Sequence, residues 1–71
     1  MADVSWNDVA PFVEDAHAVH GDIERADVVD LAYAANVSDV VIDVLDAIGS
    51  RVFKTPQDVK EFFLSRSLIS G

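Results

Sequence analysis

The sequence predicts an all-α fold, a compact bundle of four short helices in a single domain that spans residues 1–71. Three observations predict it. Apolar residues recur at helical spacing in four separate segments. Each segment is bounded by residue types that start or stop helices, such as Ser, Thr, Pro, Asn and Gly. Half of the residues are apolar (51%), which is enough for one small core, and no cysteine is present to staple it.

The first helix is expected over residues 8–20, after a loose lead-in. Asp8 is preferred to Ser5 as its N-cap, because proline is tolerated in a first turn but costs about 3 kcal/mol in a helix interior. With Asp8 as the cap, Pro11 falls in the first turn. Gly21 then ends the helix, since glycine readily adopts the left-handed conformation found at helix C-termini.

The next two helices are expected over residues 24–35 and 38–48, joined by a very short turn. Asn36 tolerates the left-handed conformation that ends a helix, and Ser38 is a suitable N-cap for the helix that follows. The second of these helices has the clearest periodicity in the chain, with apolar residues at i, i+4, i+7, i+8 and i+11 counted from Val37. This central pair therefore organises the predicted bundle.

The last helix is expected over residues 55–65, after an extended connector at residues 50–54. Its start combines Thr55 as N-cap, Pro56 at the first helical position and Asp58 at the third, and each of these favours a helix N-terminus. The residues expected to form the shared core are Val13, Leu31, Ala32, Val41, Leu45, Ile48, Phe53, Val59 and Phe62.

Charge is the strongest compositional feature, since thirteen acids and five bases give a net charge of −8. Residues 1–46 carry eleven acids and one base, a net of −10, whereas residues 47–71 carry four bases and two acids, a net of +2. Such an acidic surface repels phosphate backbones and anionic lipid, and it attracts basic partners. Aspartate outnumbers glutamate ten to three, which suggests adaptation to high salt, where excess charge is screened.

Several classes of function lack the residues that they need. No apolar run approaches the ~20 residues that span a bilayer, and the N-terminus lacks the basic and apolar regions of a signal peptide. We therefore expect a cytoplasmic protein with no membrane partner. The chain has no cysteine nucleophile and no glycine-rich phosphate loop. We accordingly predict no enzyme activity, no catalytic residues and no cofactor.

Two histidines are candidate metal ligands. His17 and His20 share a face of the first helix, and Asp22 and Glu24 follow closely in the sequence. Zinc requires three or four ligands in a fixed geometry, and only the two histidines have suitable spacing. We therefore favour surface histidines near a helix C-terminus, where the helix dipole suits them, and predict no metal site.

The central helix pair has the outline of a helix-turn-helix. Within residues 31–45, the run LAYAANVS is similar to the opening of lactose-repressor-type headpieces. In those proteins a small residue stands at the position of Ala32 and a glycine at that of Asn36. An apolar residue followed by serine stands at the positions of Val37 and Ser38. The resemblance implies DNA binding, although any tight corner between two helices uses the same residue types.

The chemistry of the third helix argues against DNA. Its outward positions are Asp39, Val40 and Asp43, whereas base reading uses Arg, Lys, Asn or Gln. Aspartates also oppose the phosphate contacts that supply much of the affinity for DNA. A degenerate or weak DNA-binding protein remains the alternative. The residues that would then contact the nucleic acid are Arg51, Lys54, Lys60 and Arg66.

A second resemblance covers more of the chain. Four short motifs lie in order between about Asp8 and Phe63: Leu31 with Ala35 (or Val28 with Ala32), Val41 to Leu45, Phe53, and Thr55-Pro56-Gln57-Asp58-Val59. In these motifs the sequence resembles the domain of unknown function family 2795. That family often has Leu-Pro before the connector, where this chain has Ile48-Gly49. The resemblance implies a compact helical module and no particular activity.

We therefore predict a non-enzymatic, acidic protein-interaction or accessory module, present as a monomer or weak homodimer. Its expected partner is a protein with a basic surface. Because two adjacent phenylalanines cannot both point fully inward, Phe62 is assigned to the core and Phe63 to the surface. The residues expected to face the partner are Asp39, Val40, Asp43, Asp46 and Phe63.

Overall fold

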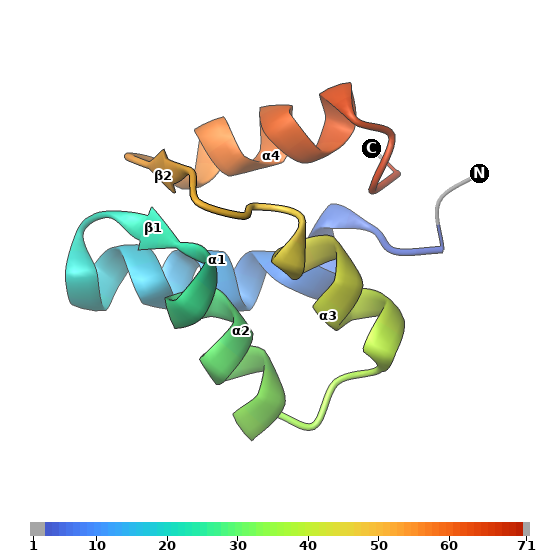
Figure 1. Ribbon diagram of the computed structural model, residues 1–71, viewed down its shortest axis with the longest axis horizontal. Coiled ribbons are helices and arrows are strands. Elements are labelled where there is room, and N and C mark those ends of the chain that lie inside the picture. The colour runs from blue at the N-terminus through green and yellow to red at the C-terminus, as the bar shows by residue number, and fades with distance from the viewer. Residues whose placement is uncertain (1–2, 71) are drawn as a thin grey trace.

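The computed structural model describes residues 3–70 and contains four helices and two very short strands. α1 lies across the middle of the molecule, α2 and α3 form a helical hairpin below it, and α4 lies above (Figure 1). The predicted bundle of four short helices is confirmed. In chain order the elements are α1 (Trp6–His20), β1 (Ile23–Glu24), α2 (Arg25–Ala34), α3 (Asp39–Asp46), β2 (Val52–Phe53) and α4 (Pro56–Ser65).

α1 begins two residues earlier than predicted, and its N-cap is Ser5 instead of Asp8. The Asp8 carboxylate accepts hydrogen bonds from the Ser5 backbone N–H (3.0 Å) and from the Ser5 hydroxyl (3.3 Å). The earlier start places Pro11 inside the helix. The prediction failed because it weighed only the proline. Trp6 packs against the core and Val9 is fully buried, and these contacts offset the cost of Pro11.

Residues 3–5, which precede α1, are part of the fold and not a loose lead-in, whereas residues 1–2 of the expected lead-in lie outside the described residues. Val4 is buried, and its carbonyl accepts a hydrogen bond from the Ser70 N–H at 2.9 Å. Ser5 and Ser70 also form an isolated parallel β-bridge. Ile69, next to this bridge, is buried in the same core as Val4. The two ends of the described chain are therefore held side by side.

The turn between α2 and α3 has the local geometry that the sequence predicted. Asn36 has a φ of 60°, so the left-handed conformation expected there is confirmed. The N–H groups of Asn36 and Val37 donate to the carbonyls of Tyr33 (3.0 Å) and Ala32 (3.3 Å), respectively. This is the Schellman arrangement, which satisfies the last carbonyls of α2. Ser38 is the N-cap of α3, as expected.

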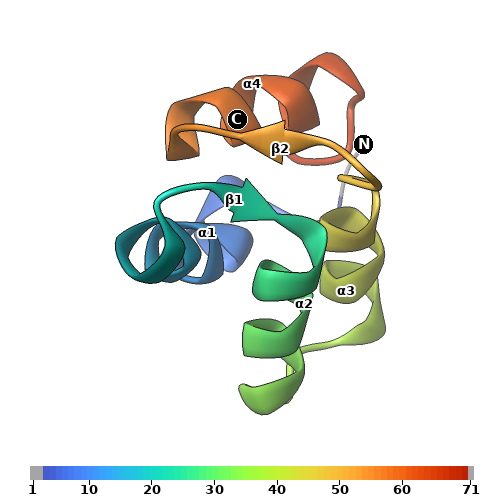
Figure 2. The ribbon, with the colours of Figure 1, turned by 60° about the vertical axis from the view of Figure 1, so that its left-hand side comes forward.

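A small antiparallel sheet was not predicted. β1 and β2 pair with Ile23 opposite Phe53 and Glu24 opposite Val52 (Figure 2). An extended connector was expected around residues 50–54, but strands of two residues carry no periodic signal in a sequence. Val52 is 48% exposed, because Ile23 and Phe53 occupy the inner side of the pair.

One apolar core joins all four helices. Three predicted members of this core, Leu31, Phe53 and Phe62, are only partly buried and pack against its edge. No helix within residues 3–70 is long and apolar enough to cross a lipid bilayer. The buried residues are Val4, Val9, Val13, Ala16, Ile23, Val28, Ala32, Val41, Ile42, Val44, Leu45, Ile48, Val59, Phe63 and Ile69.

The assignment of the two adjacent phenylalanines is wrong. Phe63 is fully buried and Phe62 is half-buried, so Phe63 cannot face a partner. The reason is the rotation of α4 about its own axis, which decides which face is buried. Val59 is also fully buried, and a residue four positions later lies on the same face of a helix. Phe63 therefore points inward with Val59, whereas Phe62 lies at the edge of that face.

Candidate interaction surface

Residues 3–70 enclose no pocket that could hold a small molecule. None of the polar or charged residues in this part of the chain is buried. Over the same residues, no group of three or more His, Asp and Glu side chains gathers in a way that could hold a metal ion. Any functional site in the described chain must therefore be argued from exposed surfaces.

The outer face of α3 carries the remaining four residues predicted to face a partner. Asp39, Val40, Asp43 and Asp46 are all exposed. These side chains face solvent because the core side chains on the opposite side of α3 fix the rotation of the helix about its axis. The buried residues of α3 are Val41, Ile42, Val44 and Leu45. We refer to Asp39, Val40, Asp43 and Asp46 together as the acidic α3 face.

The three aspartates of this face have different electrostatic surroundings. Asp39 lies in the first turn of α3, where the helix dipole favours negative charge. Asp46 accepts a hydrogen bond from Arg25 Nη1 at 2.9 Å, which links α3 to α2. Asp43 is one turn after Asp39, and like charges at this spacing repel by a few tenths of a kcal/mol. Within residues 3–70, neither Asp39 nor Asp43 forms an ion pair.

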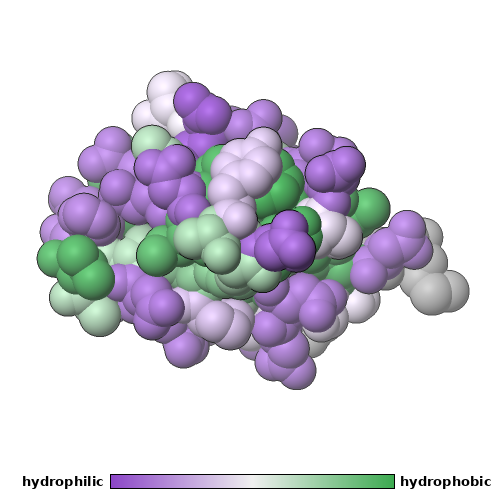
Figure 3. All heavy atoms as spheres, turned by 90° about the horizontal axis from the view of Figure 1, so that it is seen from below, coloured by the Kyte–Doolittle hydropathy of each residue, from purple (hydrophilic) through white to green (hydrophobic). Residues whose placement is uncertain are grey.

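Exposed apolar side chains lie on the acidic α3 face and close to it in the sequence. Val40 is 46% exposed and Tyr33, near the end of α2, is 65% exposed. Figure 3 looks onto the end of the molecule where the α2–α3 turn lies. It shows apolar groups in a broken band between hydrophilic margins. A partner that docks here would meet negative charge together with patches of apolar surface.

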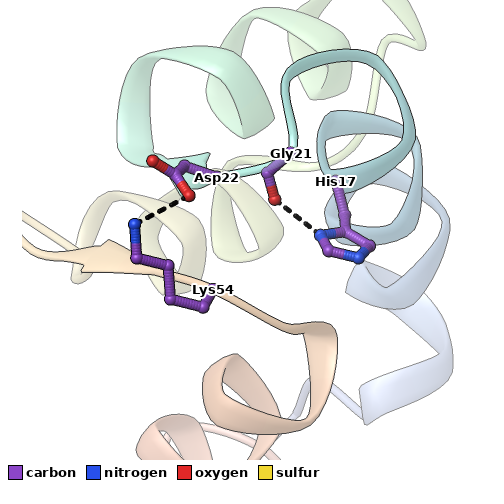
Figure 4. Close-up of polar contacts among 4 residues, drawn as sticks. All are labelled: His17, Gly21, Asp22 and Lys54. Carbon is purple, nitrogen blue, oxygen red and sulfur yellow. Dashed lines mark hydrogen bonds and ion pairs between the residues drawn. The ribbon is translucent and has the colours of Figure 1, made fainter.

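The two histidines make separate local contacts. His17 Nδ1 lies 2.6 Å from the carbonyl oxygen of Gly21 (Figure 4). Because the carbonyl can only accept, this ring nitrogen is the donor. His20 Nε2 lies 3.5 Å from Asp27 Oδ1. These contacts give both histidines a structural explanation at the C-terminal end of α1.

Asp22, the acid that follows the two histidines in the sequence, contacts the opposite strand. Lys54 Nζ donates to Asp22 Oδ1 at 3.0 Å, across the small sheet from the turn after α1 (Figure 4). Both side chains are exposed enough that such an ion pair contributes at most about 1 kcal/mol. The contact extends the pairing of β1 with β2 by one step.

A second charged surface surrounds Phe62 and was not predicted as a unit. Arg51 Cζ lies 4.7 Å and Arg66 Cζ 5.2 Å from the centroid of the Phe62 ring. Phe53 and Phe63 lie next to the same ring, with centroids 5.4 and 5.8 Å away. We call Arg51, Phe62 and Arg66 the arginine cluster. The i, i+4 spacing of Phe62 and Arg66 was the only sequence signal for it.

Comparisons with known proteins add no functional assignment. No model of a known protein family, no curated protein and no solved structure matches this chain. The acidic α3 face and the arginine cluster therefore carry the functional argument. The acidic α3 face lies on one helix, whereas the arginine cluster joins α4 and its C-cap to Arg51 in the connector before β2. The two surfaces have opposite charge.

Proposed function

We propose that this chain is a non-enzymatic, cytoplasmic interaction module that docks a basic protein surface through the acidic α3 face. The observation that supports the proposal is the composition of this face. It combines three exposed aspartates with one exposed valine, and α3 itself contains no basic residue. The lack of an enclosed pocket within residues 3–70 agrees with docking on an open surface.

A basic partner would relieve an unfavourable arrangement. The carboxylates of Asp39 and Asp43 repel one another across one helical turn, and arginine or lysine side chains placed between them would remove that repulsion. Val40 lies beside them on the same helix and offers an apolar contact for the stem of such a side chain. The face therefore offers both charge and apolar contact to a basic protein surface.

The dimensions of the face predict weak binding. α3 has eight residues and is therefore about 12 Å long. A stable protein interface usually covers about 800 Å² on each partner, which one face of so short a helix cannot supply. We therefore expect a dissociation constant on the order of micromolar, with a strong dependence on salt.

Fluorescence anisotropy with a labelled oligo-arginine peptide tests the proposal. Asp39→Asn with Asp43→Asn is expected to weaken binding by about fivefold or more at low ionic strength. The matched control is Glu14→Gln with Asp15→Asn, which removes two exposed charges from α1 and should change the affinity less than about twofold. Far-UV circular dichroism checks that each variant is folded.

Three outcomes would contradict the proposal. The first is that the peptide does not bind the wild-type chain. The second is an equal loss of affinity in the α3 variant and the α1 control, which would show attraction to net charge alone. The third is tighter binding of a labelled DNA duplex than of the peptide, which would favour the helix-turn-helix alternative. Selective loss in the α3 variant supports docking on the acidic α3 face.

A further inference from the structure

The arginine cluster concentrates positive charge in an otherwise acidic molecule. Arg51 and Arg66 are two of the three arginines in the chain. Their guanidinium carbons lie 4.7 and 5.2 Å from the same ring centroid, so they can be at most about 10 Å apart. Two like charges at such a distance repel one another. An anionic group that contacts both would therefore stabilise the arrangement.

Neither of these arginines has a carboxylate partner within residues 3–70. The three ion pairs in this part of the chain use other bases. Arg51 donates one hydrogen bond, from Nη1 to the carbonyl of Ile48 at 3.3 Å. Stacking on Phe62 orients the two guanidinium groups and leaves most of their N–H donors for another acceptor. The cluster is therefore prepared to bind a pair of carboxylates.

Within one molecule the start of the acidic α3 face lies away from the arginine cluster, and Asp46, at the other end of that face, is paired with Arg25. The arginine cluster lies on α4 and on the segment that leads into β2. Figure 1 shows α4 along one side of the molecule and the α2–α3 turn, where Asp39 begins α3, on the opposite side. The start of the acidic α3 face, at Asp39, and the α4 part of the arginine cluster thus lie on opposite sides of the molecule. Only another molecule can bring them together.

We propose that the arginine cluster of one copy binds the acidic α3 face of a second copy, in a head-to-tail contact. Asp39 and Asp43 are separated by about 6 Å along the helix axis, which suits two guanidinium groups at most about 10 Å apart. Val40 would pack on the exposed part of the Phe62 ring. The inference rests on the proposed function, because it assigns the basic surface to the same chain.

Such a contact does not end at a dimer. It joins two different surfaces, so each added copy presents a new acidic face at one side and a new arginine cluster at the other, until a ring closes or a chain ends. The average molar mass should therefore rise with protein concentration beyond twice the monomer mass. A closed dimer would instead reach a plateau at twice the monomer mass of 7.7 kDa.

The net charge gives this contact an unusual salt dependence. Each copy carries a net charge of −8, so whole molecules repel at low ionic strength. At about 0.01 M salt the Debye length is ~30 Å, close to the longest dimension of 32 Å. At about 0.15 M it is ~8 Å, and the groups in contact dominate. Association should therefore be stronger at 0.15 M than at 0.01 M, and weaker again near 1 M.

Sedimentation equilibrium of the full chain tests the inference with two complementary variants. One carries Asp39→Lys with Asp43→Lys, and the other carries Arg51→Glu with Arg66→Glu. Each variant alone is expected to associate at least about tenfold more weakly than the wild type, because like charges then face each other. An equimolar mixture of the two should regain association, since opposite charges face each other again in both contacts.

Matched controls separate the contact from general effects of charge and folding. Glu14→Lys with Asp15→Lys changes the net charge as much as the α3 variant does and should keep association. Arg66→Glu alone, compared with Lys60→Glu, tests the arginine cluster if the double arginine variant does not fold. Circular dichroism melting curves identify folded variants.

The results distinguish this inference from the proposed function. A wild-type chain that stays monomeric at all three salt concentrations overturns the inference. So does a mixture of two folded variants that fails to associate. If the oligo-arginine peptide still binds and the Asp39→Asn, Asp43→Asn variant still loses that binding, the proposed function stands and only the second copy is wrong. If the peptide also fails to bind, both are wrong.

Discussion

Arg25 Nη1 donates a hydrogen bond to Asp46 Oδ1 at 2.9 Å and joins the first turn of α2 to the last turn of α3. The α2–α3 turn closes the other end of the same helical hairpin. The contact also distinguishes the surroundings of Asp46 from those of Asp39 and Asp43. Asp46 is engaged within the molecule, whereas the other two carboxylates are directed to solvent.

Removal of this contact should have a small but measurable effect. Arg25→Ala or Asp46→Ala is expected to lower the free energy of unfolding by about 0.5 kcal/mol, because both side chains are roughly half exposed and solvent screens the pair. Urea unfolding of the wild type, both single variants and the double variant gives the coupling energy. A coupling energy of zero would show that the two residues act independently.

The two adjacent phenylalanines should differ strongly. Phe63→Ala is expected to cost about 3–5 kcal/mol, because the side chain is fully buried and its removal leaves a cavity. Stability of a domain of this size is only about 4–10 kcal/mol, so much of it would be lost. Phe62→Ala, at the edge of the core, should cost less. Equal losses in urea unfolding would contradict the observed orientation of α4.

Replacement of the interior proline should stabilise the protein. Pro11→Ala supplies the N–H that α1 lacks at this position and removes the ring that crowds the carbonyl of Asn7. The gain is expected to be about 1–2 kcal/mol, since proline also lowers the entropy of the unfolded chain. The midpoint of urea unfolding should rise with an unchanged slope. A lower midpoint would argue for a start of α1 closer to Asp8.

Salt should raise the melting temperature. With a net charge of −8, repulsion within the folded chain falls as the Debye length shrinks to ~3 Å near 1 M. A gain of about 1 kcal/mol corresponds to roughly 4–8 °C for a domain of this size. Circular dichroism melting in 0.05 M and 1 M NaCl measures it, and Glu14→Lys with Asp15→Lys should show a smaller rise. A melting temperature that does not change with salt would remove the suggestion of adaptation to high salt.

Local signals predicted those parts of the fold that local interactions determine. The Thr55 side chain accepts a hydrogen bond from the Asp58 N–H at 3.2 Å. α4 begins at Pro56, directly after this N-cap, as the sequence predicted. The left-handed backbone of Asn36 follows the end of α2, which the sequence also predicted. The start of α1 was missed because its position depends on burial of Val9 and packing of Trp6, which are tertiary contacts.

The acidic α3 face depends on local sequence, whereas the arginine cluster depends on tertiary contacts. The exposure of Asp39 and Asp43 follows from the periodicity of a single helix and could be read from the sequence. The arginine cluster could not be predicted, because Arg51 lies outside α4 and meets Phe62 only when the connector packs against that helix. A search for sequence motifs cannot find a tertiary contact of this kind.

The hydrogen bond from the Ser70 N–H to the Val4 carbonyl makes residues 4–70 one connected folding unit. Most small domains have ends that can be trimmed without loss. Here the first and last core residues, Val4 and Ile69, lie almost at the limits of the described chain. A fragment that lacks Val4, or that ends before Ile69, would lose a core residue as well as this hydrogen bond. Affinity tags and fusion partners should therefore be joined through flexible linkers that leave both ends of this unit intact.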